Sequence, residues 1–173
     1  AGGGSLTLIG TQDASCDAAL TQTGLDSTYE TYMVVISDIR VGGDSGGLGF
    51  RVGDSGGVDS GAGNYSYHIQ NLAAASTSYA AGASAGNTQI ALAETGIGNA
   101  AGEGWGGVLW IHRPGDGYTR PLISGHYTQI DASSNSQGGI IFGQREAVIT
   151  LDRVSLIGCL VTGRMTTFGL KHA

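Results

Sequence analysis

The 173-residue sequence is poor in charge: charged residues make up 13% of it, and Lys171 is its one lysine. The arginines are scattered from Arg40 to Arg164 without a basic cluster, and the formal net charge is −6. Because an acidic surface repels phosphate groups, we expect no nucleic-acid partner. No apolar run is long enough to span a bilayer, so we also expect no membrane partner.

Cysteine is scarce as well. The two cysteines, Cys16 and Cys159, match no metal-binding or redox spacing. Two buried free thiols are the expectation, and a Cys16–Cys159 bridge stays open because it depends on a proximity that sequence does not give.

Glycine, by contrast, is abundant, with 32 copies, and 40% of the residues are hydrophobic. Glycines between short apolar runs, with turn signals about every ten residues, predict an all-β sandwich or barrel with tight turns and long Gly-rich loops. We expect residues 1–26 to form an N-terminal arm and first strand. Residues 27–173 should form a single β-sandwich domain.

The strongest segment, Ser27–Val41, is apolar on both faces at its centre, which predicts a central strand buried on both sides. A hairpin with Leu48–Val52 is the simplest continuation. Asn64–Leu72 alternates as a strand with one buried face. The small, low-complexity stretch Ala73–Asn87 predicts a loop, and Pro121 predicts an edge strand or a bulge. The rest of the chain should add further strands, three or four of them in the C-terminal tail.

The pentapeptide GDSGG occurs twice, at Gly43–Gly47 and Gly53–Gly57, and matches the loop around the nucleophile of trypsin-like proteases. That family orders its triad His, Asp, Ser. Here Ser45 and Ser55 precede every histidine, and no helix follows to form a nucleophile elbow. Asp, Ser and Gly also favour tight turns. We therefore expect turns and no enzyme, although a hydrolase that pairs Ser45 or Ser55 with a later histidine stays open.

The other candidate groups have ordinary structural interpretations. Calcium ligation by the loop aspartates lacks the EF-hand spacing, and the isolated histidines form no metal motif. We predict that Trp110 lies in the core and that loop residue Trp105 is either structural or an exposed contact to a partner or a sugar. No catalytic, cofactor-binding or metal residue is predicted. The groups considered are Asp44, Asp54, Asp59, His68, His112, His126 and His172.

The end of the chain carries a resemblance. Thr162–Gly163, Met165 and the closing Phe168–Lys171 resemble the terminal segment of tailed-bacteriophage virion structural proteins. In that group the segment is an apolar strand, a small-Gly turn and a closing strand, so the resemblance implies a turn at Thr162–Gly163. The position before Gly169 is commonly Tyr in that group, and here it is Phe168. The long strand from Tyr29 and the strand–Pro turn–strand stretch from Gly106 to Asp131 resemble the same group.

The resemblance implies a jelly-roll-like β-sandwich without enzymatic activity or cofactors. The expected function is that of a capsid decoration (cement) protein, located in the virion and assembled in the host cytoplasm. It would bind the major capsid protein or other virion proteins. A homo-oligomer is expected, and a trimer is favoured by the usual local symmetry of such proteins. The alternative is a head-fibre, tail-fibre or spike domain that binds host-surface glycans.

Overall fold

A computed structural model describes residues 6–74, 76, 79–112 and 117–171. This part of the chain is all-β and antiparallel, with no helix, which confirms the predicted class of an antiparallel, sandwich-like fold. It accordingly contains no helix of the length and apolarity needed to cross a membrane. The strands are β1 (Leu6–Asp13), β2 (Asp17–Thr23), β3 (Thr31–Val41), β4 (Gly49–Asp54), β5 (Gly57–Val58), β6 (Tyr65–Ala73), β7 (Tyr79–Asn87), β8 (Ile90–Ala91), β9 (Gly104–His112), β10 (Leu122–Ile130), β11 (Ser136–Arg145) and β12 (Arg153–Leu170).

The strand β12 is the spine of one end of the sheet. Its C-terminal half pairs with β1 on one side and β3 on the other, and its N-terminal half pairs with β2 and β4. Thus β1 and β2 follow each other along one edge of β12, and β3 and β4 follow each other along the opposite edge. The predicted hairpin between Ser27–Val41 and Leu48–Val52 is therefore wrong, because both segments pair with β12.

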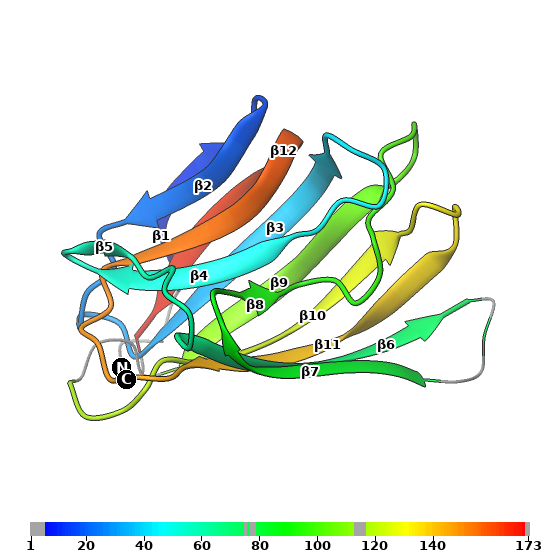
Figure 1. The fold of residues 1–173 in the computed structure, drawn as a ribbon. Helices are drawn as coiled ribbons and strands as arrows, with labels where there is room; N and C mark the ends of the chain where they lie inside the picture. The colour runs from blue at the N-terminus through cyan, green and yellow to red at the C-terminus, as the bar shows by residue number, and fades with distance from the viewer. Residues whose placement is uncertain (1–5, 75, 77–78, 113–116, 172–173) are drawn as a thin grey trace.

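From β12 the sheet continues through β3, β9, β10, β11, β6 and β7. It curls into a half-barrel, and β4, β5 and β8 lie across its inner side (Figure 1). The strand β8 pairs with β4, with Phe50 opposite Ile90. The core fills the space between the curled sheet and this covering layer; its largest fully buried side chains include Tyr32, Tyr65 and Phe50.

Both GDSGG copies form turns, as the sequence predicts. In the first copy the Gly46 amide donates to the Gly43 carbonyl, and Ser45 has a φ of 64°. In the second copy, Ser55 and Gly56 connect β4 to β5, and the Asp54 carboxylate accepts the Gly56 amide at 2.8 Å.

Three further predictions about strands need correction. Within Ala73–Asn87, predicted to be a loop, Tyr79–Asn87 forms β7, because its backbone pairs with β6 despite its small side chains. Pro121 does not mark an edge: it directly precedes β10, which is paired on both sides by β9 and β11. The C-terminal tail forms two long strands, β11 and β12, and not three or four.

Candidate interaction surface

Three rows of side chains cross the outer side of the curled sheet in register. Each row takes one residue from each of eight strands, in the order β1, β12, β3, β9, β10, β11, β6, β7. We call the three rows together the outer face. The rows are Leu6–Leu170–Thr31–His112–Leu122–Gln144–Ser66–Ala85, Leu8–Phe168–Met33–Trp110–Ser124–Phe142–His68–Ala83 and Thr11–Thr166–Val35–Val108–His126–Ile140–Gln70–Ala81.

The outer face is unusually apolar for a surface that no other described residue covers. Within the described residues, eight large hydrophobic side chains are exposed, and five of them belong to the outer face. Leu8 is 59% exposed, Leu122 50% and Phe142 48%. Because single exposed hydrophobic residues are normal but contiguous apolar patches are rare on monomers, this concentration marks an interaction surface.

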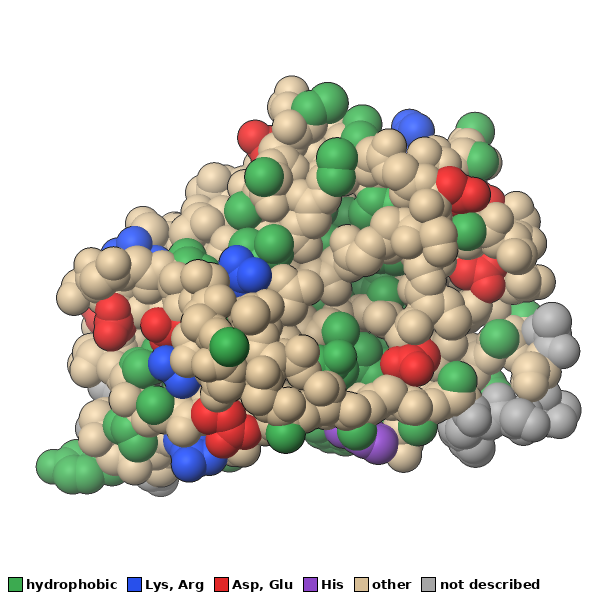
Figure 2. All heavy atoms as spheres, viewed as in Figure 1, with side chains coloured by type: hydrophobic (Ala, Val, Ile, Leu, Met, Phe, Trp, Pro, Cys, Tyr) green, Lys and Arg blue, Asp and Glu red, His purple; other side chains and the backbone are tan. Residues whose placement is uncertain are grey.

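Charge is absent from the outer face. None of its three rows contains a lysine, arginine, aspartate or glutamate. By contrast, the side that carries β4 and β8 has acidic and basic side chains spread over it (Figure 2). An uncharged apolar surface loses little hydration energy when it is covered, so it suits contact with protein.

Several polar groups of the outer face are already hydrogen-bonded to one another. His112 Nε2 lies 2.8 Å from Ser124 Oγ, and Gln144 Nε2 donates to Ser66 Oγ at 3.2 Å. These pairs join neighbouring strands within the face. When a partner covers these polar groups and displaces water from them, each group keeps a hydrogen bond within the chain, so the partner does not have to supply one.

The structure supports the structural interpretation of Trp105, whereas the prediction that Trp110 lies in the core is wrong. Trp105 is 2% exposed; its indole nitrogen donates to the Leu92 carbonyl at 3.0 Å, and its ring stacks on Tyr127. Trp110 is half-buried and belongs to the outer face. The cause is the start of β9 at Gly104, which directs Trp105, Leu109 and Ile111 inward and leaves Trp110 outward.

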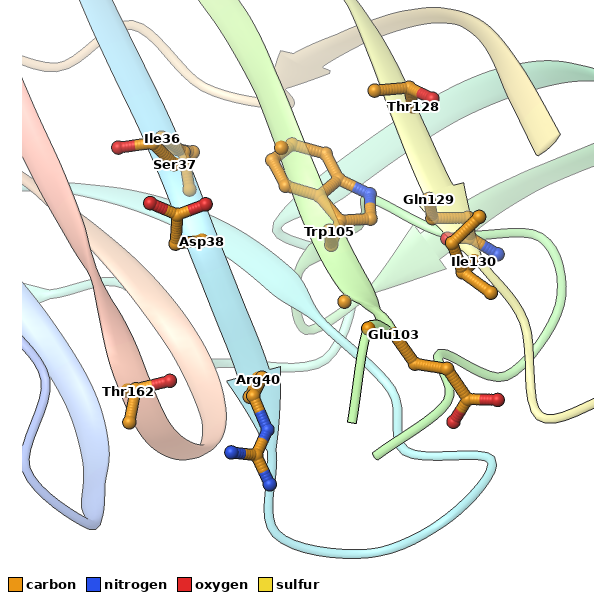
Figure 3. A pocket seen from close by; sticks show the side chains of 13 residues that line it. Ile36, Ser37, Asp38, Arg40, Glu103, Trp105, Thr128, Gln129, Ile130 and Thr162 are labelled. Atoms are coloured by element: carbon orange, nitrogen blue, oxygen red, sulfur yellow. The ribbon is translucent and has the colours of Figure 1, made fainter. Parts of the chain in front are cut away.

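A groove of about 490 Å³ lies beyond one end of the rows, between β3, β9 and β10 (Figure 3). A bulge in β3 places both Ser37 and Asp38 opposite Gly106, and Asp38 has a φ of 55°. Arg40 donates to the Asn99 carbonyl at 3.2 Å. Glu103 accepts the Ala100 amide at 2.7 Å. Two charged side chains that line the groove, Arg40 and Glu103, therefore hydrogen bond to the loop before β9 and help to hold it in place.

The structure does not bring together the groups of a serine hydrolase. Ser45 and Ser55 are both exposed in turns, and neither hydrogen bonds to His68, His112 or His126. These three histidines stand on the outer face, away from the two turns in the fold. His172 lies outside the described residues.

The remaining candidates have structural roles or none. Asp54 caps its own turn, and Asp59 forms an ion pair with Arg145 at 2.7 Å. Over the residues that the structure describes, no group of three or more His, Cys, Asp or Glu side chains is placed to hold a metal ion.

Cys16 and Cys159 are free thiols, but both are exposed, so the expectation of buried thiols is wrong. Cys159 lies where the β2–β12 ladder shifts register, and Cys16 lies in the connection before β2 with a φ of 62°.

A buried amide cluster, which the sequence does not reveal, ties the covering segment to the sheet. Gln137 Oε1 accepts Asn71 Nδ2 at 2.8 Å and Thr95 Oγ1 at 2.7 Å. Gln129 also donates to Thr95 Oγ1, and Gln137 Nε2 donates to Asp131. The cluster joins β6, β10 and β11 on their inner side, so it helps to hold the outer face in one shape.

Sequence reasoning missed the outer face as a single surface. One signal was present, since Ser27–Val41 is apolar on both sides. In the structure Tyr32, Val34 and Ile36 are buried, whereas Met33 and Val35 are covered by nothing in the described chain and remain half-buried. The prediction of burial on both sides is therefore wrong for the isolated chain.

No family model matches the sequence, and no curated protein or solved structure matches the chain.

Proposed function

We propose that the chain is a non-enzymatic structural protein of a phage virion, and specifically a capsid decoration or cement protein. It acts by binding: contacts between subunits bury surface that the free chain exposes, and this burial stabilises the assembled shell against heat and force. Its partners are the major capsid protein or other virion proteins, together with copies of itself. Its place of action is the virion.

The observation that carries this proposal is the outer face. Eight strands present an uncharged, largely apolar surface, and a surface of this kind is a feature of protein contacts. The arrangement also fits a passive structural role, because the buried amide cluster of Asn71, Gln129 and Gln137 holds strands together. The resemblance of the segment Thr162–Lys171 to tailed-phage structural proteins selects a virion among the assemblies that such a protein can join.

The location and copy number of the protein in intact particles test this function. We expect purified particles of a phage that encodes the chain to contain it at a fixed ratio to the major shell protein, measured by quantitative mass spectrometry. Cryo-electron microscopy should place it on the capsid lattice. Particles assembled without it should release their DNA at a lower temperature than complete particles.

Two results would contradict the proposal. One is absence of the protein from purified particles. The other is a location confined to fibres or the tail, combined with binding of the isolated domain to host glycans on an array. The second result would establish the glycan-binding alternative, for which the groove beside Asp38 supplies polar groups but the buried Trp105 supplies no stacking surface.

A further inference from the structure

We infer that the outer face is where a second copy of this chain packs. The inference rests on the proposed function, because it takes this face to be a protein contact, and it names the partner. The occupant is chosen on three properties of the face: its size, its lack of charge and its internally paired polar groups.

The outer face is large enough for a contact between two copies. Neighbouring strands lie about 4.8 Å apart, so eight strands span roughly 34 Å along the curved sheet. Alternate residues on a strand lie about 7 Å apart, so three rows with their side chains cover roughly 20 Å. Because the outer side of the half-barrel is convex, the resulting area of roughly 700 Å² is an upper limit on what one copy can bury, against the ~800 Å² that each partner contributes to a standard interface.

The charge distribution favours another copy of the chain over a charged partner. With a formal net charge of −6, two copies repel each other over most of their surfaces. The outer face is a region where they can meet without placing like charges opposite each other. A strongly acidic or basic partner would instead lose hydration here, and the three rows contain no lysine, arginine, aspartate or glutamate that could form an ion pair with it.

The polar groups of the outer face also suit burial. The His112–Ser124 and Gln144–Ser66 pairs keep partners within the chain when the face is covered. In a two-fold pair, unlike the trimer that the resemblance favours, each copy uses the same patch, so one set of residues serves both sides of the contact. A second copy of the chain is also present wherever the chain itself is present, which holds for no other partner.

Two matched substitutions test the inference by sedimentation equilibrium of the purified protein. Ile140 is 39% exposed within the outer face, and Val148 is 45% exposed outside it. We expect the unaltered chain and Val148→Glu to self-associate in the same concentration range. Ile140→Glu should weaken association by about 100-fold or more, because it buries two like charges without partners. Circular dichroism and thermal unfolding of each variant check that it folds.

Tryptophan quenching keeps the inference testable if Ile140→Glu fails to fold. Trp105 is buried within one chain, whereas Trp110 stands on the outer face. We expect iodide to quench the dilute protein more than the concentrated protein, and this difference should vanish in Trp110→Phe.

The outcomes separate the inference from the proposed function. A monomer at every concentration, or equal effects of Ile140→Glu and Val148→Glu, overturns the self-association contact. If that monomer still binds phage particles, the proposed function stands. A chain that self-associates through the outer face but is absent from particles would overturn the proposed function alone.

Discussion

Single side chains join distant parts of this fold, and Tyr65 is the clearest case. Its hydroxyl accepts the Val52 amide at 3.0 Å and lies 2.9 Å from the carbonyl oxygens of both Val52 and Asp59. The Arg145 guanidinium lies over its ring and pairs with the Asp59 carboxylate. One fully buried tyrosine therefore connects β4, the loop after β5 and β11.

Replacing Tyr65 by phenylalanine should destabilise the protein by about 1–3 kcal/mol, because it leaves the buried Val52 amide without its hydrogen-bond acceptor, whereas the Val52 carbonyl still accepts the Asp59 amide. Tyr67→Phe is the matched control two residues away, since no hydrogen bond of its hydroxyl to a described residue is present. Urea unfolding of both variants measures the difference. Equal stability of Tyr65→Phe and Tyr67→Phe would show that the hydroxyl contributes nothing.

Residue placement was predictable wherever one face of a strand was polar. Tyr65 and Ile69 are buried, as the alternation in Asn64–Leu72 predicts. The stretch Val108–Ile111 is apolar throughout, so it carries no alternation that distinguishes inward from outward positions. The local sequence therefore does not determine whether Trp110 faces inward or outward; this depends on where β9 begins.

At the scale of elements, β12 decides the architecture. It is 18 residues long and continues through Thr162–Gly163, where the resemblance to phage proteins predicts a turn between two strands. The ladder with β3 shifts register twice between Leu160 and Arg164, and Gly163 has a φ of 120°. The predicted turn is thus a bulge that bends one strand.

Gly163→Ala should destabilise the protein by about 1–3 kcal/mol or more, because this φ strains any residue with a Cβ. A Cβ at this position would also lie 2.7 Å from the Asp38 carbonyl oxygen. Gly47→Ala is the control, since a Cβ there meets nothing within 4 Å. Thermal unfolding should separate the two variants, and an unchanged melting temperature for Gly163→Ala would refute the bulge as a constraint.

Strand pairing was the part of the fold that the sequence left undetermined. Turn signals place β4 directly after β3 and suggest that the two pair, yet both pair with β12, which lies more than a hundred residues later. Backbone hydrogen bonds between strands do not depend on which side chains are present. The strand β7, which consists of small residues, was therefore also not predicted. The all-β class survived these errors because it depends on composition and turn spacing alone.

The whole molecule has one core, and three tyrosines from different strands share it. Tyr32 lies in β3, Tyr65 in β6 and Tyr127 in β10, and all three are buried. Desolvation by burial is the main cause that raises the pKa of each to about 12. Their ionisation therefore affects the stability of the entire half-barrel.

The stability that these three tyrosines contribute should be fully present below about pH 10, the ordinary pKa of tyrosine, and should be lost as the pH rises from there to about 12. In this range the unfolded chain loses the three phenolic protons, whereas the folded chain keeps them, so unfolding becomes favoured. Urea titrations at several alkaline pH values measure the fall. Tyr127→Phe removes one of the three groups and should make the fall shallower; a flat profile to pH 12 would contradict the prediction.

The position of β12 also has a consequence for how the protein comes into being on the ribosome. Four earlier strands, β1 to β4, take a ladder partner from residues at or beyond Arg153. Until that segment has been translated, β1 and β2 have no strand to pair with, and β3 and β4 can pair only on their other edges, with β9 and with β5 and β8. Completion of this end of the sheet is therefore a late event in biosynthesis, and a prematurely terminated chain lacks the strand that joins β1, β2, β3 and β4.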